Sequence, residues 1–132
     1  MIAVDTSVLV DLFRGRRTAA ADRLRQIEAD RISFVLPAVC CQELLQGARD
    51  EREWKLLHEY LRTQRLLTGG LWETHLDAAR IFYDCRRRGI TIRSTVDCWI
   101  AQLTLEGEHV LLHDDDDFDR ISEVRPLRLM RG

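Results

Sequence analysis

Acidic side chains occur in four separate stretches of the chain, each with a local pattern that could place them in one shared site. Asp5 follows the apolar run Ile-Ala-Val, and Asp115 and Asp117 belong to a run of four aspartates that follows Val-Leu-Leu. Glu43 and Asp97 lie in segments with the apolar periodicity of helices. Oxygen ligands without paired histidines or cysteines favour Mg²⁺ or Mn²⁺ over zinc. Such a site would suit the hydrolysis of phosphodiester bonds, in which metal ions stabilise the attacking and leaving oxygens.

Chain topology would bring together the acids that follow the two strands. Residues 2–4 and 109–113 are predicted as short strands, the first followed by Asp5 and the second by the aspartate run 114–117. When right-handed crossovers join parallel strands, the C-terminal ends of the strands lie along one edge of the sheet. Open α/β sheets bind their ligands at that edge. We therefore expect Asp5 and the aspartate run to lie close in space.

The other acids each allow a structural interpretation as well. Asp97 lies in the first turn of a predicted helix with apolar neighbours one turn later, where a carboxylate is unfavourable unless it is paired or bound to metal. The helix dipole alone also favours an acid there. Glu43 points away from the apolar stripe of its helix, as a solvated glutamate would, yet its same-face neighbours Val39 and Gly47 are not typical of a solvent-exposed face. The run 114–117 is typical of a solvated turn, but its concentrated negative potential would be relieved by a divalent cation.

Short strands alternate with helices along the whole chain. Pro37 fits the first position of a helix. In the predicted helix 50–65, we expect Trp54, Leu57 and Leu61 to form the inner face. The alternation predicts an α/β fold with a short, mainly parallel central sheet flanked by helices. The predicted strands cover residues 2–4, 33–36, 109–113 and 127–130, and the predicted helices cover residues 8–13, 18–30, 37–48, 50–65, 72–87 and 95–107.

Length and composition predict a single globular domain, residues 1–132. Hydrophobic residues make up 45% and charged residues 32% of the sequence, an ordinary globular balance. No apolar run approaches the ~20 residues of a membrane span. The first residues lack the pattern of a secretory signal, so we expect a cytoplasmic protein without membrane contact. The four cysteines lack zinc-ligand spacing and lie in apolar segments, which predicts buried free thiols.

The overall charge does not by itself indicate a nucleic-acid-binding protein, because it is −2. When the five candidate acids are set aside as metal ligands, the remainder is +3. Lys55 is the only lysine among 20 basic residues. Arginine suits bidentate contacts with phosphate, although genome composition explains an arginine excess equally well.

Four motifs, in this order, resemble the PIN-domain family and, within it, the VapC toxins of bacterial toxin–antitoxin pairs. IAVDTSVLVDLF looks like the first motif, and LPAVCCQELLQGA places Glu43 at the family's acidic position. RGITIRSTVDCWIAQL places Asp97 at the acid of the third motif. VLLHDDDDFDRI looks like the fourth, with Asp115, Asp117 and Phe118 at its DxDF positions. The resemblance covers nearly the whole chain.

The resemblance implies a PIN-like fold and metal-binding roles for Asp5, Glu43, Asp97 and Asp115, with Asp117 as a supporting acid or a second-metal ligand. It implies that these five residues are the catalytic residues of an Mg²⁺-dependent (or Mn²⁺-dependent) endoribonuclease. The family commonly has a residue other than aspartate between the last two acids. Here the whole run is aspartate, which leaves the choice of ligands within it open by one or two positions.

Two groups of residues are predicted to contact RNA. Thr6 or Ser7 resembles the hydroxyl residue that follows the family's first acid. Arginines near the acids are the other group, although a solvated helix end explains any one of them equally well. A PIN site holds phosphates without reading bases, so the sequence does not identify the RNA. The candidate arginines are Arg16 and Arg17 after the first helix, and Arg86, Arg87, Arg88 and Arg93 before the helix of Asp97.

The resemblance also implies partners: a homodimer, and a small cognate VapB-type antitoxin whose C-terminal segment covers the active site. Two alternatives stay within the PIN-like superfamily. A structure-specific DNA nuclease is one, but a chain of 132 residues lacks the insertions with which those enzymes grip DNA. A catalytically inactive PIN scaffold is the other, although the retention of all four acidic positions argues against it.

Aspartyl-phosphate enzymes fit less well. Haloacid-dehalogenase-like phosphatases need a second acid two residues after the first, where this chain has Ser7. Response-regulator receivers need a lysine at the end of a late strand, whereas Lys55 lies in a mid-chain helix.

Overall fold

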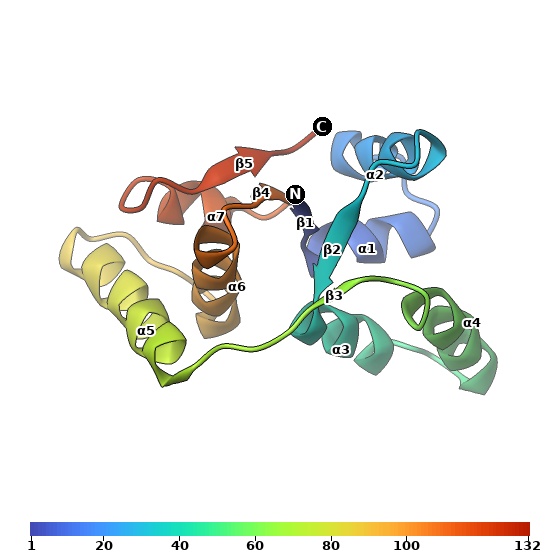
Figure 1. Ribbon diagram of the computed structural model, residues 1–132, viewed down its shortest axis with the longest axis horizontal. Helices are drawn as coiled ribbons and strands as arrows, with labels where there is room; N and C mark the ends of the chain where they lie inside the picture. The colour runs from blue at the N-terminus through green and yellow to red at the C-terminus, as the bar shows by residue number, and fades with distance from the viewer.

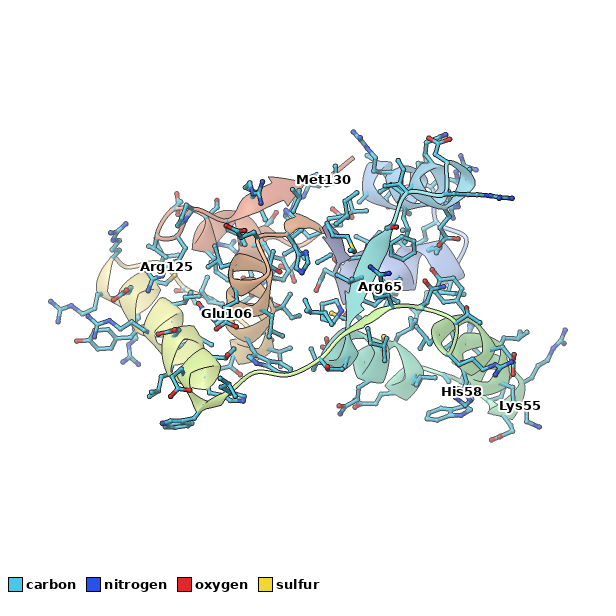
Figure 2. All side chains as sticks on the ribbon, in the orientation of Figure 1. Lys55, His58, Arg65, Glu106, Arg125 and Met130 are labelled. Carbon is cyan, nitrogen blue, oxygen red and sulfur yellow. The ribbon has the colours of Figure 1, made fainter.

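A five-stranded, fully parallel sheet forms the centre of the molecule in a computed structural model that describes residues 1–132 (Figure 1). The strand order is β3-β2-β1-β4-β5, and Ala3 of the central strand pairs with Val35 on one side and Leu111 on the other. The predicted α/β fold is therefore confirmed, and the sheet is parallel throughout. The strands are β1 (Ile2–Val4), β2 (Phe34–Pro37), β3 (Leu66–Leu67), β4 (Val110–Leu112) and β5 (Arg128–Met130).

Seven helices cover the two faces of the sheet. Right-handed crossovers that run from β1 to β2 and from β2 to β3 place their helices on one face of the sheet. The crossovers from β3 to β4 and from β4 to β5 run in the opposite direction, so their helices lie on the other face. Figure 1 shows this division: α1 to α4 lie on one side of the sheet and α5 to α7 on the other. The helices are α1 (Thr6–Phe13), α2 (Ala19–Ala29), α3 (Ala38–Gln46), α4 (Glu51–Leu61), α5 (Trp72–Arg87), α6 (Thr95–Glu106) and α7 (Asp116–Ile121).

The core lies between the sheet and both helical layers. Leu9 of α1 and Ile100 of α6 are fully buried on opposite faces of the sheet, and Phe118 of α7 is fully buried as well. All four cysteines are buried and free, as predicted. None of the helices combines the length and the apolar character needed to span a bilayer.

Three features differ from the sequence-based prediction. Strand β3 was not predicted, because two residues are too few to show an alternating pattern. Helix α7 was not predicted either, since its acidic first turn was interpreted as a possible solvated turn. The prediction that Trp54 faces inward was wrong: its side chain is 43% exposed, whereas Leu57 and Leu61 are buried. The helix that carries them ends at Leu61 rather than residue 65.

The strand order fixes the position of a ligand crevice. From β1 the chain moves first to β2 and later crosses back to β4, so the direction of winding reverses between β1 and β4. The C-terminal ends of two strands that flank such a reversal leave a crevice between their diverging helices. Asp5 follows β1, and the aspartate run follows β4. The fold therefore places both acidic segments at this reversal point, where open α/β sheets bind their ligands.

Candidate active site

Asp5 is held at the end of β1 by its own helix. It caps α1, because its side chain accepts hydrogen bonds from the backbone N–H of Ser7 at 3.0 Å and from the Ser7 hydroxyl at 2.6 Å. Its backbone N–H donates to the carbonyl of Leu112, so β1 and β4 stay paired up to the site. Asp5 is buried, and this burial raises the pKa of its carboxyl despite the hydrogen bonds from Ser7. The site therefore contains a buried carboxylate without a cationic partner.

A chain of hydrogen bonds folds the segment after β4 against the end of β1. The hydroxyl of Ser7 accepts the backbone N–H of Asp114 at 3.0 Å. Buried His113 accepts the backbone N–H of Asp115 at its Nδ1 atom, and Asp115 in turn caps α7 by accepting the backbone N–H of Asp117 at 2.9 Å. These bonds hold the side chains of Asp115 and Asp117 near the carboxylate of Asp97.

Three carboxylates meet at the centre of the site. Asp97, Asp115 and Asp117 each offer an oxygen, and these atoms all lie within 4.8 Å of one another. Burial raises the pKa of Asp97 to about 8, with further contributions from its hydrogen bond to Asp117 and from the nearby charges of Asp5 and Asp115. Burial works against ionisation of Asp117 as well, but hydrogen bonds from Asp97 and Arg93 lower its pKa below the ordinary value. Asp97 therefore lacks a cationic partner, whereas Asp115 and Asp117 share the guanidinium of Arg93.

Glu43 lies at the rim. It projects from α3 into solvent, and the hydroxyl of Thr6 donates to its carboxylate at 2.8 Å. It does not belong to the three-carboxylate cluster. Its neighbour Cys40 donates weakly to Asp5 at 3.8 Å, and burial followed by the charge of Asp5 raises the pKa of that thiol well above its ordinary value.

The aspartate run divides by alternate positions. Asp115 and Asp117 enter the cluster, whereas Asp114 and Asp116 turn outward to Arg131. The structure thus brings together Asp97, Asp115 and Asp117. Asp5 lies outside this cluster but near enough for its charge to raise the pKa of Asp97, and Glu43 is joined to the site through Thr6. The hydroxyls of Thr6 and Ser7 both have acidic partners within the site, and their contact with substrate remains a prediction.

The predicted arginines lie at different distances from the cluster. Arg93 reaches it, with its guanidinium 3.2 Å from Asp115. Arg88 does not contact the cluster and instead donates to the backbone carbonyl of Glu123. Arg16 and Arg17 pair instead with Asp11 and Asp22, and Arg86 and Arg87 lie against the rings of Phe82 and Tyr83.

One arginine at the site was missed. Arg120 lies 3.0 Å from Asp117, one turn later on α7. Its i, i+3 spacing would have revealed the contact if α7 had been predicted.

Fold and site together define an α/β domain of the PIN type, with its acids at the reversal point of a parallel sheet. The model of the PIN domain matches residues 2–124, and the chain belongs to this family. The chain is 34% identical over 138 aligned positions to VapC ribonuclease Mb1587 of Mycobacterium bovis and to Ribonuclease VapC11 of Mycobacterium tuberculosis, covering 97% of this chain and 96% of each relative.

Solved structures share the fold at lower identity. VapBC2 from Rickettsia felis, bound to a DNA fragment from its promoter, has a chain that superposes with a TM-score of 0.78 at 17% identity, covering 98% of both chains. FitAcB from Neisseria gonorrhoeae gives a TM-score of 0.76 at 19% identity and covers 99% of this chain and 97% of that one. Because both identities are low, these likenesses bear on the fold alone.

Proposed function

We propose that this chain is a metal-dependent endoribonuclease of the VapC type, a cytoplasmic toxin that a cognate antitoxin neutralises. The observation that carries the proposal is the cluster of Asp97, Asp115 and Asp117 at the reversal point of the sheet, in which Asp97 and Asp117 are buried and Asp115 is half-buried. The relatives that bear the name ribonuclease span nearly the whole chain, which supports RNA as the substrate. No observation favours the DNA nuclease or the inactive scaffold.

The cluster fits a small divalent cation. All of its donors are carboxylate oxygens, the ligands that Mg²⁺ and Mn²⁺ prefer. Ligand oxygens around Mg²⁺ are about 3.0 Å apart when adjacent and about 4.2 Å apart when opposite, so the three oxygens, which lie within 4.8 Å of one another, would move inward around the ion. Asp97, Asp115, Asp117 and Asp5 would hold the ion, and Glu43 could reach it from the rim.

Bound divalent cations supply Lewis-acid stabilisation of the phosphate and activate the attacking water. The chain supplies the geometry for this chemistry. Ser7 fixes Asp5 and the backbone of Asp114 with one hydroxyl, so the ends of β1 and β4 keep a constant separation. Thr6 orients Glu43, and His113 orients the turn that carries Asp115. Since these hydrogen bonds form within the folded chain, the acids need little rearrangement when a cation binds.

Cleavage of RNA by the purified protein tests this function. We expect cleavage in Mg²⁺ or Mn²⁺, none in EDTA, and a loss of more than tenfold in the Asp97→Asn variant, or over about 1.4 kcal/mol of transition-state stabilisation. Asp116→Asn is the matched control, because Asp116 belongs to the same acidic segment but faces away. Undiminished cleavage in EDTA would exclude the metal mechanism, and cleavage of DNA in preference to RNA would exclude the proposed substrate.

This chain has a groove beside the site that suits an antitoxin. A cavity of about 300 Å³ lies between α1, α3 and α4 and is lined by Phe13, Leu44 and Leu56, with Glu43 at its edge. The groove has apolar residues with charged ones around them, which fits a short amphipathic helix. An arginine that follows this helix could pair with the carboxylates and compete with the metal.

Expression in cells tests the antitoxin. The chain expressed alone should arrest growth, and coexpression of the protein encoded by the neighbouring gene should restore it. Leu56→Asp should weaken that rescue while leaving RNA cleavage unchanged, because Leu56 is already 62% exposed. Ile32→Asp, at a 48% exposed residue outside the groove, serves as the control. A chain that is harmless alone would contradict the toxin assignment.

A homodimer is the proposed assembly, and α5 offers a surface for it. Leu71, Trp72 and Leu76 are exposed there, and the indole N–H of neighbouring Trp99 is buried without a hydrogen-bond partner. Exposed apolar patches of this kind mark protein interfaces. Light scattering should give twice the chain mass for the wild type and a single chain mass for Trp72→Glu. A monomeric wild type would contradict the dimer.

A further inference from the structure

Two arginines share one buried carboxylate at the edge of the site. Asp117 is 1% exposed, and it accepts from the guanidinium of Arg93 at 3.4 Å, from the backbone N–H of Arg93 at 3.0 Å, and from Arg120 at 3.0 Å. Arg93 belongs to the segment before α6, whereas Arg120 belongs to α7. The buried acid therefore holds together two cations from different parts of the chain.

These two arginines line one cavity. It has a volume of about 430 Å³, and its wall includes Gly89, Thr91, Arg93, Arg120 and Glu123. Few of its lining residues are apolar, so a polar ligand suits it better than a hydrophobic one. Because the arginines in its wall also contact Asp117, the cavity adjoins the carboxylate cluster directly.

Arg120 keeps most of its hydrogen-bonding capacity. A guanidinium has five N–H donors, and Arg120 uses one of them, toward Asp117. Arg131 is different: it pairs with Asp114, Asp116 and Asp119 together, so three carboxylates already surround its charge. The side chains of Arg93 and Arg120 are 68% and 40% exposed, which leaves their free donors accessible from the cavity.

The carboxylates of the site repel each phosphate of a bound RNA strand unless a cation lies next to that phosphate. Metal ions would offset that repulsion at the scissile phosphate, but not at its neighbours. We propose that Arg93 and Arg120 form a phosphate-binding subsite for the RNA phosphate next to the scissile one. The assignment rests on the proposed ribonuclease function. Arginine forks suit this contact, because they donate two parallel hydrogen bonds to phosphate oxygens.

Binding of a short oligoribonucleotide in Ca²⁺, followed by fluorescence anisotropy, tests the subsite, with a gel to verify that the RNA stays intact. Arg120→Gln should weaken binding about fivefold and reduce the slope of log affinity against log salt by about 0.7, the value for one lost contact to a single strand. Arg120→Lys should keep the salt slope. Arg62→Gln is the matched control, since Arg62 forms the same i, i+3 pair with Glu59 at 3.0 Å, but just before β3 at the opposite edge of the sheet.

Oligonucleotides with a single uncharged methylphosphonate distinguish phosphate binding from a structural role. Neutralising the phosphate next to the cleavage site should weaken wild-type binding and have no further effect on Arg120→Gln, because two changes to one contact are not additive. Additive losses, or an unchanged affinity and salt slope in Arg120→Gln, would overturn the subsite. A wild type that binds RNA in this way but cleaves none in Mg²⁺ would retain the subsite and refute the ribonuclease. Failure of the wild type to bind RNA would refute both.

Discussion

Two groups of aspartates within one six-residue segment have opposite environments. The inner pair, Asp115 and Asp117, lies close to the carboxylate of Asp97, and Asp117 is almost fully buried. The outer group, Asp114, Asp116 and Asp119, lies in solvent around Arg131. The same side chain is therefore a candidate metal ligand at one position and part of a surface ion pair at the next. Both groups have arginine partners, since Arg93 and Arg120 pair with the inner aspartates and Arg131 pairs with the outer ones. The difference lies in the direction of the side chains, because only the inner pair lies close to the carboxylate of Asp97.

The alternation has a simple backbone origin. Residue 115 is extended, with φ −138° and ψ 125°, and α7 begins immediately after it. An extended residue sends neighbouring side chains to opposite sides, so Asp114 and Asp115 diverge. The Asp115 side chain then accepts the backbone N–H of Asp117, which holds it against the first turn of α7. Adjacent acids thus acquire different environments through one extended residue and one helix cap.

The largest expected effect is the loss of RNA cleavage when an acid of the site becomes an amide, compared with the same change in the outer group. Asp5→Asn should reduce kcat/KM for RNA by at least about a hundredfold, or about 2.7 kcal/mol. Asparagine is as good a helix cap as aspartate, so the loss would report the charge and not the fold. Asp114→Asn should stay within about twofold of wild type, as expected for an exposed ion pair. Equal losses in both variants would remove the distinction between the groups.

Sequence reasoning found the inner acids but not all of their surroundings. Asp5 and the aspartate run were predicted to meet because strand topology follows from the alternation of strands and helices. Which aspartates face inward depends on the backbone angles at Asp115, which no periodic pattern encodes. Arg120 was missed for the same reason, since its contact with Asp117 exists only once α7 has formed. The acidic sites follow from topology, whereas the orientation of side chains required the folded turn.

A smaller effect is expected on the stability of the metal-free protein. Burial raises the pKa of Asp97 to about 8, so ionising this group destabilises the folded state. Asp97→Asn should therefore raise the free energy of unfolding in EDTA at pH 8 by at least about 1 kcal/mol. The amide can still donate to Asp117, as the protonated acid does.

The sign of the pH dependence follows from the raised pKa. The stabilising contribution of protonated Asp97 is present below the ordinary carboxyl pKa of 3.8 and is lost as pH rises toward about 8. The stability difference between Asp97→Asn and wild type should thus grow across this window, measured by urea unfolding in EDTA. A difference independent of pH would show that Asp97 is not the titrating group.

The smallest effect is expected in the outer group. Arg131→Gln should lower the free energy of unfolding by less than about 1 kcal/mol, because its partners are exposed and solvent screens them. The loss should shrink further at high salt. Urea unfolding at two ionic strengths measures both effects. A loss as large as that of a buried ion pair would mean that Arg131 organises the site after all.

Direct titration with Mn²⁺, followed by electron paramagnetic resonance, tests most directly whether the inner acids form a metal site. The wild type should bind Mn²⁺, Asp97→Asn should bind it at least about tenfold more weakly, and Asp116→Asn should bind it within about twofold of wild type, where tenfold corresponds to about 1.4 kcal/mol. This result would assign metal binding to the buried cluster and not to acidic charge in general. Equal Mn²⁺ affinity in wild type and Asp97→Asn, or an equal loss in both variants, would contradict it.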